Sequence, residues 1–171
     1  LDHPAKLLST LILNGESTAC YDGQYFFDTD HSSKNSGTQD NDLGASATSA
    51  TAPTAAERST AIMKAGQGLY ALKDDEGEPA NQMAKKFGVM VPVPFMGVTL
   101  EAITSLPGAG GATNLIPSLA ARGMLAFEPI IHPRLTWTTK FCVMRLDGPT
   151  KPFVLQEEGA IEQLALAPPA A

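Results

Sequence analysis

At the start of the chain, apolar residues recur every three to four positions, which predicts a first amphipathic helix. The predicted helix covers residues 2–13, with one apolar face made by Leu7, Leu8, Leu11 and Ile12. Asp2 suits its N-cap and Pro4 its first turn. Asn14-Gly15 predicts a left-handed stop. A helix this short is marginal alone, so its apolar face is expected to dock on another part of the protein.

The next pattern predicts a β-hairpin. Two short runs of β-prone residues, 18–21 and 24–27, flank Asp22-Gly23. Asp and Gly tolerate the positive φ angles of a type I′ turn, so this pair predicts a tight two-residue connection. A polar turn over residues 28–31 then closes the hairpin.

Residues 32–56 break the pattern. Small and polar side chains dominate this stretch, and Leu43 is its only large apolar residue. Such a composition buries too little surface to offset the entropy of ordering, which predicts an exposed loop. An insertion of this length inside a compact domain also indicates a surface or subunit-contact role.

Helical periodicity returns at Thr54. Thr54 and Glu57 match a capping box, and a helical stripe follows at Ile62, Ala65, Leu69 and Leu72. Gly66 and Gly68 each weaken a helix by about 1 kcal/mol relative to Ala. Their presence therefore indicates close packing against a neighbouring segment.

The remaining pattern alternates strands with one more helix. A buried strand is predicted at 88–93, with Pro92 and Pro94 placing its end near a sheet edge. A helix is predicted at 96–106 and a flexible glycine-rich loop at 107–111. Further strands are predicted at 124–131, 136–146 and 152–156, with a turn at 147–149 and a peripheral tail from Gly159. The expected fold class is α+β: helix, strand, helix, then a mostly antiparallel meander.

Composition narrows the class of protein. The 171 residues are 43% hydrophobic and 18% charged, with a net charge of −6, which is typical of a globular domain. The Lys and Arg residues are scattered, so no specific nucleic-acid site is expected. Cys20 and Cys142 lack any CxxC partner, which favours neither a zinc site nor a disulfide framework. No signal peptide and no apolar run of membrane-spanning length is visible, so no membrane partner is expected.

The most enzyme-like cluster is Asp28, Asp30 and His31, with Asp22 nearby. Two carboxylates and an imidazole could bind a divalent metal, but Asp and His after a hairpin more often bond their own backbone. Other candidate groups favour structural roles, so no catalytic, cofactor-binding or metal site is expected. These groups are the acidic run 74–78 at a helix end, the glycines 108–111, and Cys20 or Cys142 with either His31 or His132 as a base.

Two sequence motifs resemble the major head subunit family of Mu-like phages and prophages. The first is Cys20-Tyr21-Asp22-Gly23-Gln24 followed by Phe26-Phe27-Asp28-Thr29-Asp30-His31, and the second is the segment 146–156 with Lys151-Pro152-Phe153-Val154-Leu155-Gln156. The family usually carries Pro where Tyr25 and Ser32 stand. The stretch 32–56 has no counterpart in this resemblance.

The resemblance implies the tailed-bacteriophage major capsid protein fold. It implies a peripheral helix and hairpin over 1–31, the exposed loop 32–56, an α+β axial-type core over 57–158 and a tail over 159–171. The N-terminal arm and the closing C-terminal segment of such proteins would then be absent, so that the chain is a fragment with the axial domain and part of the peripheral domain.

The function implied by the resemblance is that of a structural shell subunit rather than an enzyme. Its partners would be copies of itself in hexamers and pentamers. Scaffold, portal and decoration proteins are further candidates. The expected location is the virion capsid, assembled in the bacterial cytoplasm. Two alternatives stay open: a metal-dependent hydrolase using Asp28, Asp30 and His31, and a small phage-derived binding module, which would be a monomer with a concave apolar pocket.

Overall fold

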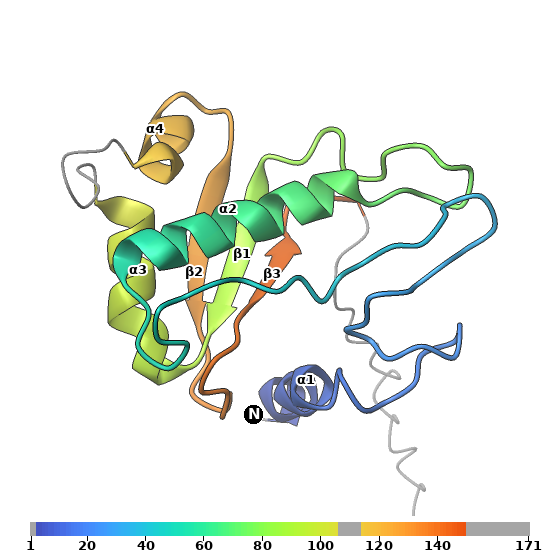
Figure 1. Ribbon diagram of the computed structural model, residues 1–171, viewed down its shortest axis with the longest axis horizontal. Helices are drawn as coiled ribbons and strands as arrows, with labels where there is room; N and C mark the ends of the chain where they lie inside the picture. The colour runs from blue at the N-terminus through green and yellow to red at the C-terminus, as the bar shows by residue number, and fades with distance from the viewer. Residues whose placement is uncertain (1–2, 106–113, 150–171) are drawn as a thin grey trace, which may run out of the picture.

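The computed structural model describes residues 3–105 and 114–149, which fold around a mixed three-stranded sheet (Figure 1). The described elements are α1 (His3–Leu13), α2 (Ala55–Ala71), β1 (Lys86–Val91), a 3-10 turn η1 (Val93–Phe95), α3 (Met96–Thr104), α4 (Leu115–Ala121), β2 (Ala126–Ile131) and β3 (Cys142–Arg145). The α+β class predicted from the sequence agrees with this arrangement. None of these helices is long and apolar enough to cross a bilayer.

The sheet has the order β2-β1-β3, with β1 in the centre. β1 runs parallel to β2, with Phe87 opposite Phe127, and antiparallel to β3, with Val89 opposite Val143. The antiparallel pairing expected between the strands predicted at 124–131 and 136–146 is therefore wrong, because β2 and β3 both pair with β1 and the helix-containing crossover between β1 and β2 makes that pair parallel. Pro92 and Pro94 predict that the end of the first strand lies near a sheet edge; β1 is instead the central strand, and both prolines lie just beyond its end at Val91.

β1 is buried on both faces, which explains its continuous apolar sequence. On one face, Phe87, Val89 and Val91 form a core with residues from three other elements. These residues are Ile62 of α2, Phe95 of η1 and Ile103 of α3. On the opposite face, Met90 packs in a second cluster with Ile12, Leu135 and Met144. Figure 1 shows α2 lying across the strands on the first face. Leu8 and Ile12 of the predicted apolar face of α1 pack in this second cluster, whereas Leu7 and Leu11 are exposed, so the predicted face is confirmed only in part.

Local signals at the start of the chain are partly confirmed. The helix over His3–Leu13 forms, although Asp2 lies outside the described residues. Gly15 does not adopt a positive φ angle, so the predicted left-handed stop is wrong. Its lack of a side chain is needed for packing, because a Cβ there would lie 2.5 Å from Cδ2 of Phe27.

The predicted hairpin reverses the chain, but by a different turn. Ala19 and Tyr25 form an isolated antiparallel bridge, and the N–H of Cys20 donates to the carbonyl of Gln24 at 2.7 Å. A type I′ turn needs a positive φ at both Asp22 and Gly23. Gly23 has a φ of +85°, but Asp22 does not have a positive φ, because Lys34 is the only described non-glycine residue that does. The type I′ prediction for Asp22-Gly23 is therefore wrong. The three-residue connection with glycine at its last position matches the next commonest hairpin class.

The helix predicted from Thr54 is confirmed with its capping box. The side chain of Thr54 accepts from the N–H of Glu57, and the carboxylate of Glu57 accepts from the N–H of Thr54 at 2.8 Å. The close packing inferred from the two glycines is also present. A Cβ on Gly66 would lie 2.9 Å from the ring of Phe127, and one on Gly68 would overlap Leu43.

The later elements differ more from the predictions. The helix at Met96–Thr104 and the strand at Ala126–Ile131 are confirmed within a few residues. The strand predicted at 136–146 is regular only over Cys142–Arg145, and α4 was not predicted at all. The predicted loop 107–111, the strand 152–156 and the tail from Gly159 lie outside the described residues.

Candidate functional site: the hairpin network and the groove beside β3

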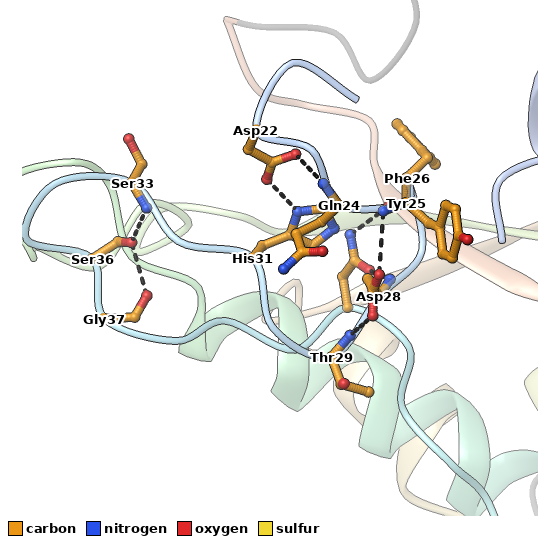
Figure 2. A network of polar contacts seen from close by, with 11 residues as sticks. Asp22, Gln24, Tyr25, Phe26, Asp28, Thr29, His31, Ser33, Ser36 and Gly37 are labelled. Atoms are coloured by element: carbon orange, nitrogen blue, oxygen red, sulfur yellow. Dashed lines mark hydrogen bonds and ion pairs between the residues drawn. The ribbon is translucent and has the colours of Figure 1, made fainter. Parts of the chain in front are cut away.

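The segment after α1 is held by a network of hydrogen bonds around Asp22 and His31 (Figure 2). One carboxylate oxygen of Asp22 accepts from Nδ1 of His31 at 2.7 Å, and the other accepts from the N–H of Gln24 at 3.2 Å. The bond from His31 lowers the pKa of Asp22. Nε2 of His31 is buried and has no hydrogen-bond partner. The His31–Asp22 pair therefore ties the far end of the turn to the tip of the hairpin.

Asp28 binds backbone groups rather than facing a shared centre. Its Oδ1 accepts from the N–H of Thr29 at 2.8 Å and its Oδ2 from the N–H of Tyr25 at 3.2 Å, which lowers the pKa of its carboxyl. Asp30 is exposed. Among residues 3–105 and 114–149, no group of three or more His, Cys, Asp or Glu side chains is placed to hold a metal ion. The geometry gives Asp28 the backbone-bonding role common in turns.

The two cysteines lie in different environments, and both are free thiols. Cys142 sits in β3, and burial raises its pKa to about 12, which opposes formation of a nucleophilic thiolate. His31 is engaged with Asp22, while Nδ1 of His132 accepts from the N–H of Arg134 at 3.3 Å. The structure thus brings neither histidine into a recorded hydrogen bond with a thiol.

The acidic run after α2 forms a local turn and a link to the polar loop. Oδ1 of Asp74 accepts from the N–H groups of Glu76 and Glu78, at 3.0 and 2.9 Å. Asp75 pairs with Lys34 at 2.5 Å, at the surface. The predicted solvated helix end agrees with this geometry. The glycines 108–111 lie outside the described residues.

The loop 32–56 contains no helix or strand before α2 begins, yet it is bonded along its length to other segments. The side chain of Gln39 makes two hydrogen bonds to the backbone of Lys73, donating at 2.6 Å and accepting at 2.8 Å. Thr48 donates to Glu57 at 2.7 Å from both its N–H and its hydroxyl. These bonds hold the loop beside α2, as its path in Figure 1 also shows.

A groove of about 510 Å³ lies between this loop, α2 and the edge of the sheet at β3. Its apolar walls come from segments far apart in sequence, including Phe26, Phe27, Leu43, Leu69, Leu72, Trp137, Val143 and Met144. A volume of this size falls within the range of ligand and peptide clefts. No local pattern in the sequence predicts this groove. Leu43, the one large apolar residue of the loop, is the only local sign that the loop packs against an apolar surface.

A buried cation lies on α2. Arg58 on α2 is 3% exposed, and its guanidinium lies 4.3 Å from the ring centre of Phe95 and 4.7 Å from that of Phe141. Nε of Arg58 has no hydrogen-bond partner, and burial lowers the pKa of the group. The two rings therefore provide the contacts that hold this charge in the core.

Comparison with known proteins gives one match. Residues 1–58, which are 58 of the 171, match the family model described as Mu-like prophage major head subunit gpT. The match spans the hairpin motif and extends through the stretch 32–56, for which the two sequence motifs offer no counterpart. No curated protein and no solved structure matches the chain. The resemblance expected from the motif at Cys20–His31 is confirmed: the first 58 residues of the chain are similar to the major head subunit of Mu-like prophages.

Proposed function

We propose that this protein is a structural subunit of a phage head, which assembles with copies of itself into an icosahedral shell around the genome. The observation that carries the proposal is the match of residues 1–58 to the Mu-like prophage major head subunit. The hydrogen-bond network of the hairpin supports it, because Asp22, Asp28 and His31 act there as structural groups.

We also propose the domain arrangement that this role implies. The mixed sheet with helices on both faces is compatible with the axial domain of a tailed-phage capsid protein, with residues 1–31 as part of the peripheral domain. Residues 57–158 would then be the axial body, and 159–171 a peripheral tail. The virion capsid is the proposed location, and scaffold, portal or decoration proteins are further proposed partners.

Exposed apolar side chains in the matched region suit contact between copies. Leu7 and Leu11 lie one turn apart on α1 and are 48% and 45% exposed, and Tyr21 at the hairpin tip is 94% exposed. A contact patch on a shell subunit must be covered by a neighbour, which explains apolar side chains left open on the isolated chain. We include the outer side of α1 among the proposed contacts.

A second candidate is a small binding module, and the groove of about 510 Å³ is the observation that favours it. A concave apolar pocket is what this alternative predicts, together with a stable monomer. Oligomeric state therefore separates the two candidates.

Sedimentation velocity of the protein from its complete reading frame, over a range of concentrations, tests the proposal. A head subunit is expected to sediment as rings or larger particles, whereas a species that stays monomeric at every concentration contradicts it. The Leu7→Glu/Leu11→Glu double variant should shift the distribution toward the monomer. Leu115→Glu, at a more exposed position outside the matched region, is the control and should leave the distribution unchanged.

A further inference from the structure

The groove runs along one side of the strand β3. Within the described residues, β3 pairs with β1 only, so its other side forms the edge of the sheet. All four residues of β3, Cys142–Arg145, line the groove. An edge strand beside an apolar cleft is the arrangement that accepts an added strand, because backbone groups supply hydrogen bonds and the cleft takes side chains.

The groove reaches both faces of the sheet. Val143 packs with the core under α2, whereas Met144 packs with the cluster around Ile12. An incoming strand places successive side chains on opposite faces, so both walls can be filled at once. The walls of the groove match this requirement. One wall contains Leu43 of the loop and Leu69 of α2, and the other contains Phe27 and Trp137 of the second cluster.

The described chain ends at the rim of this groove. Gly148 and Pro149, the last two described residues, are among those that line it. The sequence continues with Lys151-Pro152-Phe153-Val154-Leu155-Gln156, three consecutive apolar residues between polar ones. An extended chain advances about 3.3 Å per residue, so Phe153 can lie roughly 13 Å beyond Pro149, well within reach of the cleft.

We propose that the groove is the docking site of residues 152–156 of the same chain, which pair with β3 as a fourth strand and bury Phe153, Val154 and Leu155. Pro152 fits this placement, because proline is tolerated at the first residue of a strand. This inference does not depend on the proposed role in a phage head.

The turn before the segment favours the same chain over a second copy as its source. Oδ2 of Asp147 accepts from the N–H of Lys85 at 2.7 Å, and Oδ1 accepts from Nε of Arg145 at 2.8 Å. These bonds fix the start of the connection next to β1 and β3. A link of only two residues between Pro149 and Pro152 then gives the segment a high effective concentration at the groove.

Thiol labelling of the full-length chain tests the proposal, with Cys142 as the reporter inside the groove and Cys20 as the internal reference outside it. Phe153→Asp should raise the labelling rate of Cys142 about tenfold or more and leave that of Cys20 unchanged, since a covered thiol reacts through the open form. Leu166→Asp, on the same tail but outside the segment, is the matched control and should change neither rate. Equal Cys142 rates in the wild-type and Phe153→Asp chains would overturn the proposal.

Cross-linking gives a second measurement that does not rely on the destabilising variant. In a Cys20→Ser/Phe153→Cys chain, a short bismaleimide should join Cys142 to the new thiol within one chain, and the product should run as a monomer on a denaturing gel. Cys20→Ser/Ala170→Cys should give little of this product. A predominantly dimeric product would assign the groove to a second copy, and the absence of any product would remove the docking; either result overturns the proposal.

Discussion

Leu43 and Gly68 pack so closely that a Cβ on residue 68 would overlap Cδ1 of Leu43. Leu43 comes from the polar loop and Gly68 from the last turns of α2. Both residues line the groove beside β3. The contact explains why a glycine stands in the helix and how the loop contributes an apolar wall to the groove.

The two glycines of α2 provide a matched pair of substitutions. Gly66→Ala should destabilise the protein by about 1–3 kcal/mol, because the added methyl meets the buried ring of Phe127. Gly68→Ala should change the free energy of unfolding by less than about 1 kcal/mol, since Leu43 can rotate away and alanine gains helix propensity. Chemical denaturation measures both. A larger loss from Gly68→Ala than from Gly66→Ala would show that the side chain of Leu43 cannot move aside and would contradict this expectation.

Among the described residues, Arg58 contacts two aromatic rings and forms no ion pair with a carboxylate, which predicts an unusual order of stability among its variants. Arg58→Lys should destabilise by about 1–3 kcal/mol, because a compact ammonium keeps the buried charge but loses the planar stacking. Arg58→Met should cost less, since it removes the uncompensated charge and fills the same space. Urea unfolding of the three proteins gives the order. If Arg58→Lys were as stable as the wild type while Arg58→Met were strongly destabilised, the positive charge would be required, and this expectation would be contradicted.

Asp147 predicts a specific acid sensitivity. Its bonds to Arg145 and to the N–H of Lys85 hold its pKa at about 2, below its ordinary value of 3.8. A lowered folded-state pKa means that the carboxylate stabilises the fold above about pH 4, and that this contribution is lost as the pH falls toward 2. Asp147→Asn should therefore be less stable than the wild type at pH 7, with the difference shrinking between pH 4 and 2. A difference that is constant over this range, measured by denaturant unfolding, would count against the bonds to Asp147.

The capping box of α2 can be measured by one substitution. Thr54→Ala removes the acceptor for the N–H of Glu57 and should cost about 1 kcal/mol. Thr60→Ala is the control, because its hydroxyl only bonds back to the carbonyl of Ala56 within the helix. Thermal unfolding should show a clear loss for Thr54→Ala and a small effect for Thr60→Ala. Equal effects of the two substitutions would show that the cap contributes nothing specific.

Elements with strong local signals could be predicted from the sequence. The capping box at Thr54 marks the start of α2 to within a residue, and the glycines Gly66 and Gly68 correctly indicate close packing. The apolar run in β1 is recognisable because the strand is buried on both faces. The backbone-bonding role of Asp28 also follows from the chemistry of turn residues.

Features that depend on distant segments could not be predicted in this way. Strand order is set by long-range contacts, so neither the central position of β1 nor its parallel pairing with β2 is visible in a local pattern. The helix α4 is only seven residues long and contains Pro117, which hides its period. The groove needs Phe27, Leu43 and Trp137 to meet, and no spacing rule relates these three positions.

Electron microscopy of the purified protein, produced from its complete reading frame, tests the proposed role in a phage head most directly. Closed shells or five- and six-membered rings of uniform size are the predicted result. A field of dispersed single subunits at high concentration, with the fold intact by circular dichroism, would contradict it.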